Sequence, residues 1–203
     1  EFIIYSFYNN LIESKSEIYK IKTPNIDSNI LNESKRGNEF IKKLNEWTGC
    51  KGMELIFRGT IDGSSVFHNK CDNKGETITL IKNEKGNIFG GYASIPWTNP
   101  NNKTWLSAPE SFLFTLSNIY NTEPTKFPSR NDQKEVLHYS GYGPIFGYGT
   151  DLGINVDILK DGGWCGFPYT YQDFLGKGYS IFSGDFNTSS FTIKEIEVFK
   201  IFK

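Results

Sequence analysis

The chain has 203 residues, which is enough for one domain with a sizeable hydrophobic core. Its 22 basic and 23 acidic residues leave a formal net charge of −1, whereas broad nucleic-acid binding requires a basic face. The sequence lacks a long apolar run, so no membrane-spanning segment is predicted. With 17 Phe, 11 Tyr, 20 Gly and 8 Pro, the composition favours short strands joined by turns over a helical bundle.

The cysteine content argues against a disulfide scaffold. The chain has three scattered cysteines: Cys50, Cys71 and Cys165. Their odd number predicts reduced thiols and a cytoplasmic protein. Residues 1–24 are expected to be an N-terminal extension or linker, because Pro24 breaks the chain there. The main domain is predicted over residues 25–203, and the start at Glu1 in place of Met indicates an excised or processed piece.

The clearest helix is predicted over residues 38–48, between a capping Asn38 and a terminating Gly49. Its apolar residues recur at helical spacing: Phe40, Ile41, Leu44 and Trp47. A strand is predicted next, over residues 52–58. The residues expected on one face of that strand are Met53, Leu55 and Phe57. The Asp62-Gly63 pair that follows is typical of a turn.

Residues 76–94 predict a β-hairpin around the polar tip NEKGN, because apolar residues alternate on both arms. In the second arm, Gly90-Gly91 indicates a bulge or the close approach of another backbone. The polar segment 96–110 is expected to be a loop. The continuous apolar run 111–118 is predicted to be a buried strand.

The second half of the chain has weaker periodicity. Residues 121–134 are expected to be a polar excursion, and residues 135–156 two strands around a glycine-rich corner. Residues 159–178 lack periodicity and predict a long surface loop. The final strand, within residues 189–202, alternates but slips at Lys194-Glu195, as a bulge would cause. The whole pattern predicts a mainly β fold with a few helices, arranged as a two-sheet antiparallel β-sandwich.

His68, Cys71 and Asp72 bring metal-binding and nucleophilic side chains close together in sequence. A second ligand pair for zinc is missing, and the Asp72 segment lacks the spacing of a calcium loop, so no metal site and no cofactor are predicted. A reactive thiolate formed by Cys71 with His68 or His138 stays open. The favoured interpretation is a half-buried thiol in a turn that leads into the strand from Thr77.

Two carboxylates of the final strand, Glu195 and Glu197, lie two residues apart and are expected to share one face. Paired carboxylates serve acid–base chemistry, but a solvated strand face is the favoured interpretation. Asp62 is interpreted as capping the backbone of its turn. The glycine corner around Gly147 lacks the ending and the following helix of a phosphate loop, so a tight β-corner is predicted there.

Loop aromatics leave glycan binding open as another function. The four residues concerned are Trp97, Trp105, Trp164 and Tyr169. Exposed rings can stack on sugars, whereas the favoured interpretation is that these rings fold back over the sheet edges.

Five blocks in chain order resemble the TLDc domain, a family that includes the eukaryotic oxidation-resistance proteins. They are ELIFRGTIDGSS, FHNKCDNKGETITLIKNEKGNIFGGYASIPW, SFLFTLSN, YGPIFGYGTDLGI and FTIKEIEVFKI. The resemblance covers residues 25–203. The family pattern falls on Asp62, Gly63, His68, Cys71, Asp72, Gly90, Gly91, Gly143, Gly147, Gly149, Asp151, Leu152 and Glu197.

The resemblance implies a β-sandwich flanked by helices, without an established reaction. It implies a non-catalytic protein-interaction module, linked to oxidative-stress resistance and to binding and regulation of the vacuolar-type proton ATPase. Such a partner would recruit a cytoplasmic protein to an organelle. The chain departs from the family at Phe199, where tryptophan is frequent, and in the loop 161–178. The competing function is a weak redox or hydrolytic enzyme that uses Cys71, or Asp62 with His68 and Glu197.

Overall fold

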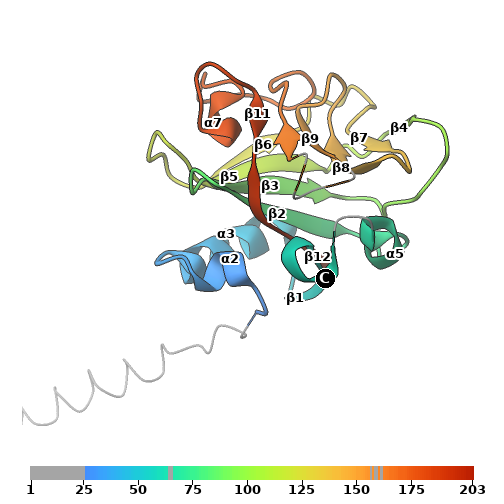
Figure 1. The fold of residues 1–203 in the computed structure, drawn as a ribbon, viewed down its shortest axis with the longest axis horizontal. Coiled ribbons are helices and arrows are strands. Elements are labelled where there is room, and N and C mark those ends of the chain that lie inside the picture. Colours follow the sequence, from blue (N-terminus) through green and yellow to red (C-terminus); the bar gives the residue numbers. More distant parts are fainter. Residues whose placement is uncertain (1–25, 64–65, 156, 158–159, 161) are drawn as a thin grey trace, which may run out of the picture.

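The computed structural model describes residues 26–63, 66–155, 157, 160 and 162–203, and these form two six-stranded antiparallel sheets (Figure 1). The predicted mainly β fold with a few helices is thereby confirmed. The expected extension over residues 1–24 lies outside the described residues.

The first sheet has the strand order β1-β12-β2-β3-β5-β6, and each neighbouring pair is antiparallel. Its strands are β1 (Gly52–Arg58), β2 (Thr77–Asn83), β3 (Ile88–Ala93), β5 (Phe112–Ser117), β6 (Thr125–Pro128) and β12 (Ile193–Phe202). The last strand of the chain therefore lies between two strands from its first half.

The second sheet has the order β11-β10-β9-β8-β7-β4, again antiparallel throughout. Its strands are β4 (Thr104–Leu106), β7 (Val136–His138), β8 (Tyr142–Phe146), β9 (Leu152–Asn155), β10 (Gly163–Trp164) and β11 (Ser190–Phe191). These strands are short, because turns with positive-φ glycines interrupt the chain repeatedly.

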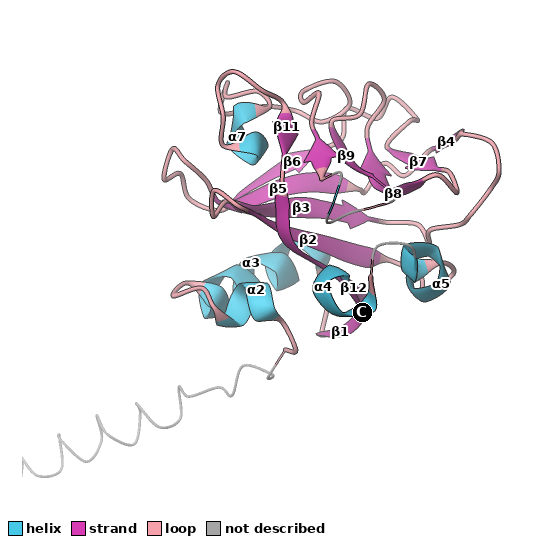
Figure 2. Cartoon of the chain, in the orientation of Figure 1, coloured by secondary structure: helices cyan, strands magenta, loops and turns pink. Residues whose placement is uncertain are grey.

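The helices lie around the first sheet and at one end of the sandwich (Figure 2). They are α2 (Asn29–Asn32), α3 (Gly37–Thr48), α4 (Gly59–Asp62), α5 (Phe67–Cys71) and α7 (Ser180–Ser183). Helices α2 and α3 cover the face of the first sheet that points away from the second sheet. We call this the helix-covered face.

The first sheet is buried on both sides, which gives the protein two hydrophobic cores. Phe112 and Phe114 of β5 face the helices, whereas Leu113 faces the second sheet. A strand buried on both faces has no polar side to alternate with. The continuous apolar run 111–118 is thus explained, and its prediction as a buried strand is confirmed by β5.

The structure differs from the prediction in two details, one in strand β1 and one in helix α3. A register shift between Leu55 and Phe57 places Phe57 in the core between the sheets, whereas Met53 and Leu55 pack on the helix-covered face. The prediction that all three share one face was therefore wrong, because a bulge reverses the alternation. Helix α3 ends at the left-handed Gly49 as predicted, but its N-cap is Arg36 and not Asn38.

Two segments predicted to lack regular structure contain strands, and a third contains one strand more than predicted. The segment 96–110 includes β4, and the segment 121–134 includes β6. The segment 135–156 contains three strands, β7 to β9, in place of the two predicted. Strands of three to five residues show too little alternation to be recognised in a sequence.

The segment predicted as a surface loop over 159–178 contributes to the core. It contains β10, and Cys165, Phe167 and Tyr171 are each at least 98% buried between the sheets. Its aromatic residues lack periodicity because they enter the core from irregular backbone. The surface-loop interpretation was wrong for this part of the chain.

The hairpin and the final bulge are confirmed. Strands β2 and β3 pair around residues 84–87, and β12 shifts register between Ile193 and Glu195. A Cβ on Gly91 would lie 2.6 Å from the Phe146 ring of the other sheet. Gly91 therefore permits the close approach of a side chain. Gly90 permits the predicted approach of another backbone, because a Cβ there would lie 1.9 Å from the Thr79 carbonyl oxygen.

Candidate functional site

Glu197 lies at the centre of a buried polar cluster on the helix-covered face. Its carboxylate accepts hydrogen bonds from the Ser28 hydroxyl at 2.5 Å and the Asn29 amide at 2.7 Å. Arg58 Nε donates to it at 3.1 Å, and the second partner of Arg58 is the exposed Asp27. Burial raises the pKa of Glu197, while these three donors act in the opposite direction. The cluster ties the start of α2 to β12.

The favoured interpretation of Glu195 and Glu197 as a solvated pair was wrong. Glu197 is fully buried and Glu195 is 7% exposed. Glu195 accepts from the hydroxyl and the amide of Thr60 and from the amide of Ile196. Each carboxylate is occupied by its own donors, so the two do not act as one acid–base pair.

Asp62 is connected to the Glu197 cluster through the backbone of Arg58. Its carboxylate accepts from the Arg58 amide at 2.8 Å and forms an ion pair with Lys70 at 3.0 Å. Burial acts to raise the pKa of Asp62, but these contacts outweigh it and the pKa is lowered. The residue therefore caps backbone as predicted, although it does so at the start of α4, and Gly63 ends that helix with φ +80°.

His68 lies on α5 and connects this helix to the second sheet. Its Nδ1 lies 2.9 Å from an Asp72 carboxylate oxygen, and its Nε2 lies 3.0 Å from the Tyr142 carbonyl. The Tyr139 carbonyl is 3.2 Å from the same Nε2. The structure therefore does not join the predicted set of Asp62, His68 and Glu197, because His68 contacts Asp72 and two backbone carbonyls instead.

Cys71 is fully buried at the end of α5, in a short helix where a turn was expected. It packs in the core between the sheets, and burial raises the pKa of its thiol far above the ordinary range, with Asp72 and Asp62 adding to the effect. A thiolate is the nucleophilic form, so this environment suppresses reactivity. The thiol is buried more completely than the half-buried state expected.

His138, the other histidine, is 2% exposed and lies on β7. Its Nδ1 contacts the Thr98 hydroxyl at 2.7 Å, and its Nε2 has no hydrogen-bond partner among the described residues. Burial lowers the pKa of His138 to about 4. The ring is therefore neutral at physiological pH, and its centre lies 5.4 Å from that of Trp97, with the two planes tilted by 44°.

The glycine corner between β8 and β9 is built on Asp151. This fully buried carboxylate accepts from three consecutive backbone amides, those of Tyr169, Thr170 and Tyr171. Burial raises the pKa of Asp151 to about 6, against the effect of the three amides. Gly147 is required beside it, because a Cβ there would lie 2.3 Å from an Asp151 oxygen and φ is +80°. The predicted tight corner is found here.

The other glycines of the family pattern have distinct environments. A Cβ on Gly90 would lie 1.9 Å from the Thr79 carbonyl oxygen, and one on Gly149 would touch the Tyr169 ring at 3.0 Å. Gly143 has ordinary spacing, with Ile154 at 3.4 Å.

One buried carboxylate escaped the sequence interpretation. Glu135 is fully buried and accepts from the Ala108 amide and the Ser129 hydroxyl, both at 2.8 Å. Like Asp151, it holds backbone in place without an ion pair to a cation of the described residues. Tyr171 contacts both residues, since its amide donates to the Asp151 carboxylate and its hydroxyl to the Glu135 carbonyl.

The four loop aromatics differ in exposure. Trp97 is 1% exposed and its indole donates to Thr77, so it belongs to the core. Trp105 and Trp164 are half-buried and contact Tyr148 and Tyr142 edge-on. Only Tyr169 among the four is largely exposed, at 65%. The rings therefore do not form one sugar-stacking platform.

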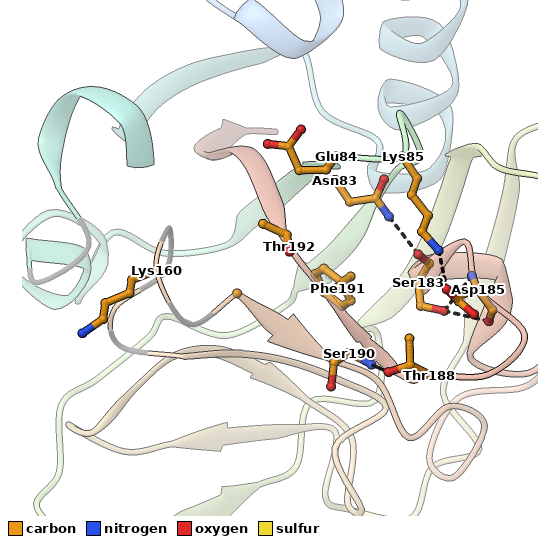
Figure 3. Close-up of a pocket in the computed structure, with 11 residues that line it drawn as sticks. Asn83, Glu84, Lys85, Lys160, Ser183, Asp185, Thr188, Ser190, Phe191 and Thr192 are labelled. Atoms are coloured by element: carbon orange, nitrogen blue, oxygen red, sulfur yellow. Dashed lines mark hydrogen bonds and ion pairs between the residues drawn. The ribbon is translucent and has the colours of Figure 1, made fainter.

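A pocket of about 370 Å³ opens beside the β2–β3 turn, α7 and β11 (Figure 3). Lys85 and Asp185 point toward one another and form an ion pair at 2.5 Å, while Lys160 lies across the pocket. With Glu84, the lining has two positive and two negative side chains. Balanced charge selects no ligand class.

Among the described residues, no three His, Cys, Asp or Glu side chains are arranged to hold a metal ion. No helix in the described part of the chain is long and apolar enough to cross a membrane.

The fold and its polar residues define a class of protein: a two-sheet β-sandwich whose buried carboxylates and histidines hold segments together. A family model of the TLDc domain matches residues 24–202. The chain belongs to the TLDc domain family. None of the curated proteins compared matches it.

Proposed function

We propose that this chain is a non-catalytic docking module that binds the vacuolar-type proton ATPase, and that it supports oxidative-stress resistance through that partner. Membership of the TLDc family supports an interaction role. The proposal also places the protein in the cytoplasm until the ATPase recruits it to a membrane.

The observation that carries the proposal is a group of aromatic residues on adjoining loops, Trp105, Tyr148 and Tyr169, which we call the aromatic surface; the Tyr169 ring lies beside Gly149, the residue after Tyr148. Tyr148 and Tyr169 are 50% and 65% exposed, and the Trp105 ring lies 5.5 Å from that of Tyr148. Exposed tyrosine and tryptophan rings are typical anchors of protein interfaces.

The loops behind the aromatic surface are fixed by buried donors and acceptors. Asp151 accepts from the Tyr169 amide, and the Tyr148 amide donates to the Thr170 hydroxyl at 2.8 Å. Ordering of loops before binding removes part of the entropy cost of association. The family residues Gly147 and Asp151 thus serve docking by holding the anchors in place.

The groups suggested for catalysis support the same proposal, because each is occupied within the fold. Glu197 and Asp62 are engaged by Arg58, His68 by carbonyls, and Cys71 is a buried thiol with a raised pKa. No described feature favours the redox or hydrolytic alternative.

Binding of the purified chain to the purified peripheral sector of the proton ATPase tests the proposal by biolayer interferometry. Saturable binding is expected, and it should weaken about ten-fold when Tyr148→Ser and Tyr169→Ser are combined. Ile61→Ser is the matched control, because Ile61 is 72% exposed but lies on α4. Absence of saturable binding by the unaltered chain would reject this partner.

A further inference from the structure

His68 faces hydrogen-bond acceptors with both of its ring nitrogens. Its Nδ1 is directed at the Asp72 carboxylate, at 2.9 Å, and its Nε2 lies within 3.2 Å of the carbonyl oxygens of Tyr139 and Tyr142. A neutral imidazole has one N–H donor and one acceptor nitrogen, whereas the imidazolium has two donors. A neutral His68 beside an ionised Asp72 would therefore direct a lone pair at an oxygen on one side of the ring.

The contacts of His68 are largely shielded from water. The side chains of His68 and Asp72 are 12% and 15% exposed, and the centres of the His68 and Phe67 rings are 5.1 Å apart. Water is then a poor substitute for a missing donor, so an unmatched lone pair is costly. Because a carboxyl group loses its proton more readily than an imidazolium does, the geometry selects a doubly protonated His68 beside an ionised Asp72.

These contacts join a short helix to a distant turn. Helix α5 packs beside β1 through Phe67, whose ring lies 5.9 Å from that of Phe57. Tyr139 and Tyr142 flank the turn between β7 and β8 in the second sheet, and the Tyr142 amide donates to the Tyr139 carbonyl at 3.2 Å. A helix of five residues is not stable alone, so its outside contacts decide how firmly it is held.

We propose that His68 is a pH-sensitive latch, which holds α5 to the turn between β7 and β8 while both ring nitrogens carry a proton. When one proton is lost, the Asp72 carboxylate retains the N–H of Nδ1, and Nε2 presents a lone pair to two carbonyl oxygens. The contact to the turn is then lost and α5 is held less firmly. The inference does not depend on the ATPase partner, because every group involved belongs to this chain.

The charged and titratable side chains on the helix side of the latch have partners or are shielded. Lys70 forms an ion pair with Asp62 at 3.0 Å. Burial raises the pKa of the Cys71 thiol far above the ordinary range. Lys74 lies beyond Asp72, on the segment that leads to β2.

On the side of the second sheet, the nearest titratable ring is that of His138 on β7. Burial lowers the pKa of His138 to about 4, so this ring is already neutral where an ordinary histidine titrates. The Lys103 ammonium lies 5.7 Å and 5.1 Å from the ring centres of Tyr139 and Tyr142. Lysine and tyrosine side chains ordinarily titrate well above the histidine range. His68 is therefore the group to which we assign the pH response of the latch.

Asp72→Asn separates the latch from its second proton. The amide group of asparagine can donate to an unprotonated Nδ1, so a neutral ring with its proton on Nε2 keeps every contact. The nitrogen NMR shifts of the His68 ring distinguish the two cases. In the unaltered chain both nitrogens should be protonated at about pH 6, whereas in Asp72→Asn Nε2 alone should be protonated at about pH 8.

Hydrogen exchange of the Asp72 amide measures opening, because this amide donates to the His68 carbonyl at 3.0 Å and closes the end of α5. Its protection factor is compared with those of amides in β2, in the interior of the first sheet, which report global unfolding. Relative to them, it should fall about ten-fold between about pH 6 and about pH 8 in the unaltered chain. The asparagine amide of the variant should show no such fall.

His138→Gln is the matched control, because it removes the other histidine and should keep the ten-fold fall. An unprotonated His68 nitrogen in the unaltered chain at about pH 6 would overturn the inference. The same pH response in the unaltered chain and in Asp72→Asn would also overturn it, as would a fall that disappears in His138→Gln. Because these measurements use the chain alone, their failure leaves the proposed ATPase binding standing, and failure of that binding leaves the latch standing.

Discussion

Glu197 and Asp151 are both fully buried carboxylates, but they are held in opposite ways. Glu197 is neutralised by the guanidinium of Arg58, whereas the donors to Asp151 among the described residues are backbone amides. The first arrangement stabilises the domain by a long-range ion pair. The second arrangement fixes loops around Asp151, and the raised pKa of this carboxylate makes its charge depend on pH.

The comparison predicts that loss of Glu197 has the largest effect on stability. Glu197→Ala leaves Arg58 buried with only the exposed Asp27 as partner, and it frees the Ser28 hydroxyl and Asn29 amide. The free energy of unfolding should fall by about 4 kcal/mol. Urea unfolding followed by circular dichroism measures this loss.

Asp27→Ala serves as the control, because this partner of Arg58 is 74% exposed and its loss should cost less than about 1 kcal/mol. Similar losses for the two variants would contradict the view that the buried ion pair dominates this region.

The pH-dependent contribution of Asp151 to stability should come next in size. The folded pKa of Asp151, about 6, lies above its unfolded value of 3.8, so its contribution is complete below pH 3.8 and is lost as pH rises through 6. The loss amounts to about 3 kcal/mol. Asp151→Asn should remove this contribution, as measured by urea unfolding of the variant and the unaltered chain between pH 4 and 7.

His138 opposes that trend. Its folded pKa of about 4 lies below the unfolded value of 6.5, so its contribution is complete above pH 6.5 and is lost as pH falls toward 4. The two slopes nearly cancel in the unaltered chain. His138→Gln should therefore make stability decrease with rising pH, and Asp151→Asn should make it increase; slopes of the same sign would contradict the assignment.

Packing between the sheets gives a smaller effect. Gly91→Ala would place a methyl group 2.6 Å from the Phe146 ring, so we expect a loss of about 2 kcal/mol in the free energy of unfolding. Gly52→Ala is the comparison, since its nearest atom is 3.9 Å away. If the two variants were equally stable, the close approach of the sheets at Gly91 would be refuted.

Cys71→Ser should have the smallest effect of the series. A serine hydroxyl in this apolar core should cost about 1 kcal/mol of stability, without changing protection of cells against peroxide. Survival after peroxide treatment measures the second quantity. Lost protection by a folded, normally expressed variant would restore the redox alternative.

Elements with a clear hydrophobic period could be predicted from the sequence. The burial of residues whose partners are distant in sequence could not. The alternation of residues 76–94 and its interruption at Lys194-Glu195 are local signals, and both features are present. The burial of Glu197 depends on Arg58, 139 residues away, and on Ser28, 169 residues away. A charged residue on a strand is usually solvated, so no local signal indicated the ion pair.

The wrong loop assignments have a related cause. Strand β10 has two residues, and Tyr171 is buried because its amide and that of Thr170 bind Asp151. The signal that was present is composition: a segment rich in phenylalanine and tyrosine is seldom left in solvent.

The most direct test of the account compares two variants in one binding assay with the purified peripheral ATPase sector. We expect Cys71→Ser to bind like the unaltered chain, whereas the combined Tyr148→Ser and Tyr169→Ser variant should bind about ten-fold more weakly. Undiminished binding by the tyrosine variant, together with loss of binding by a folded Cys71→Ser variant, would contradict it.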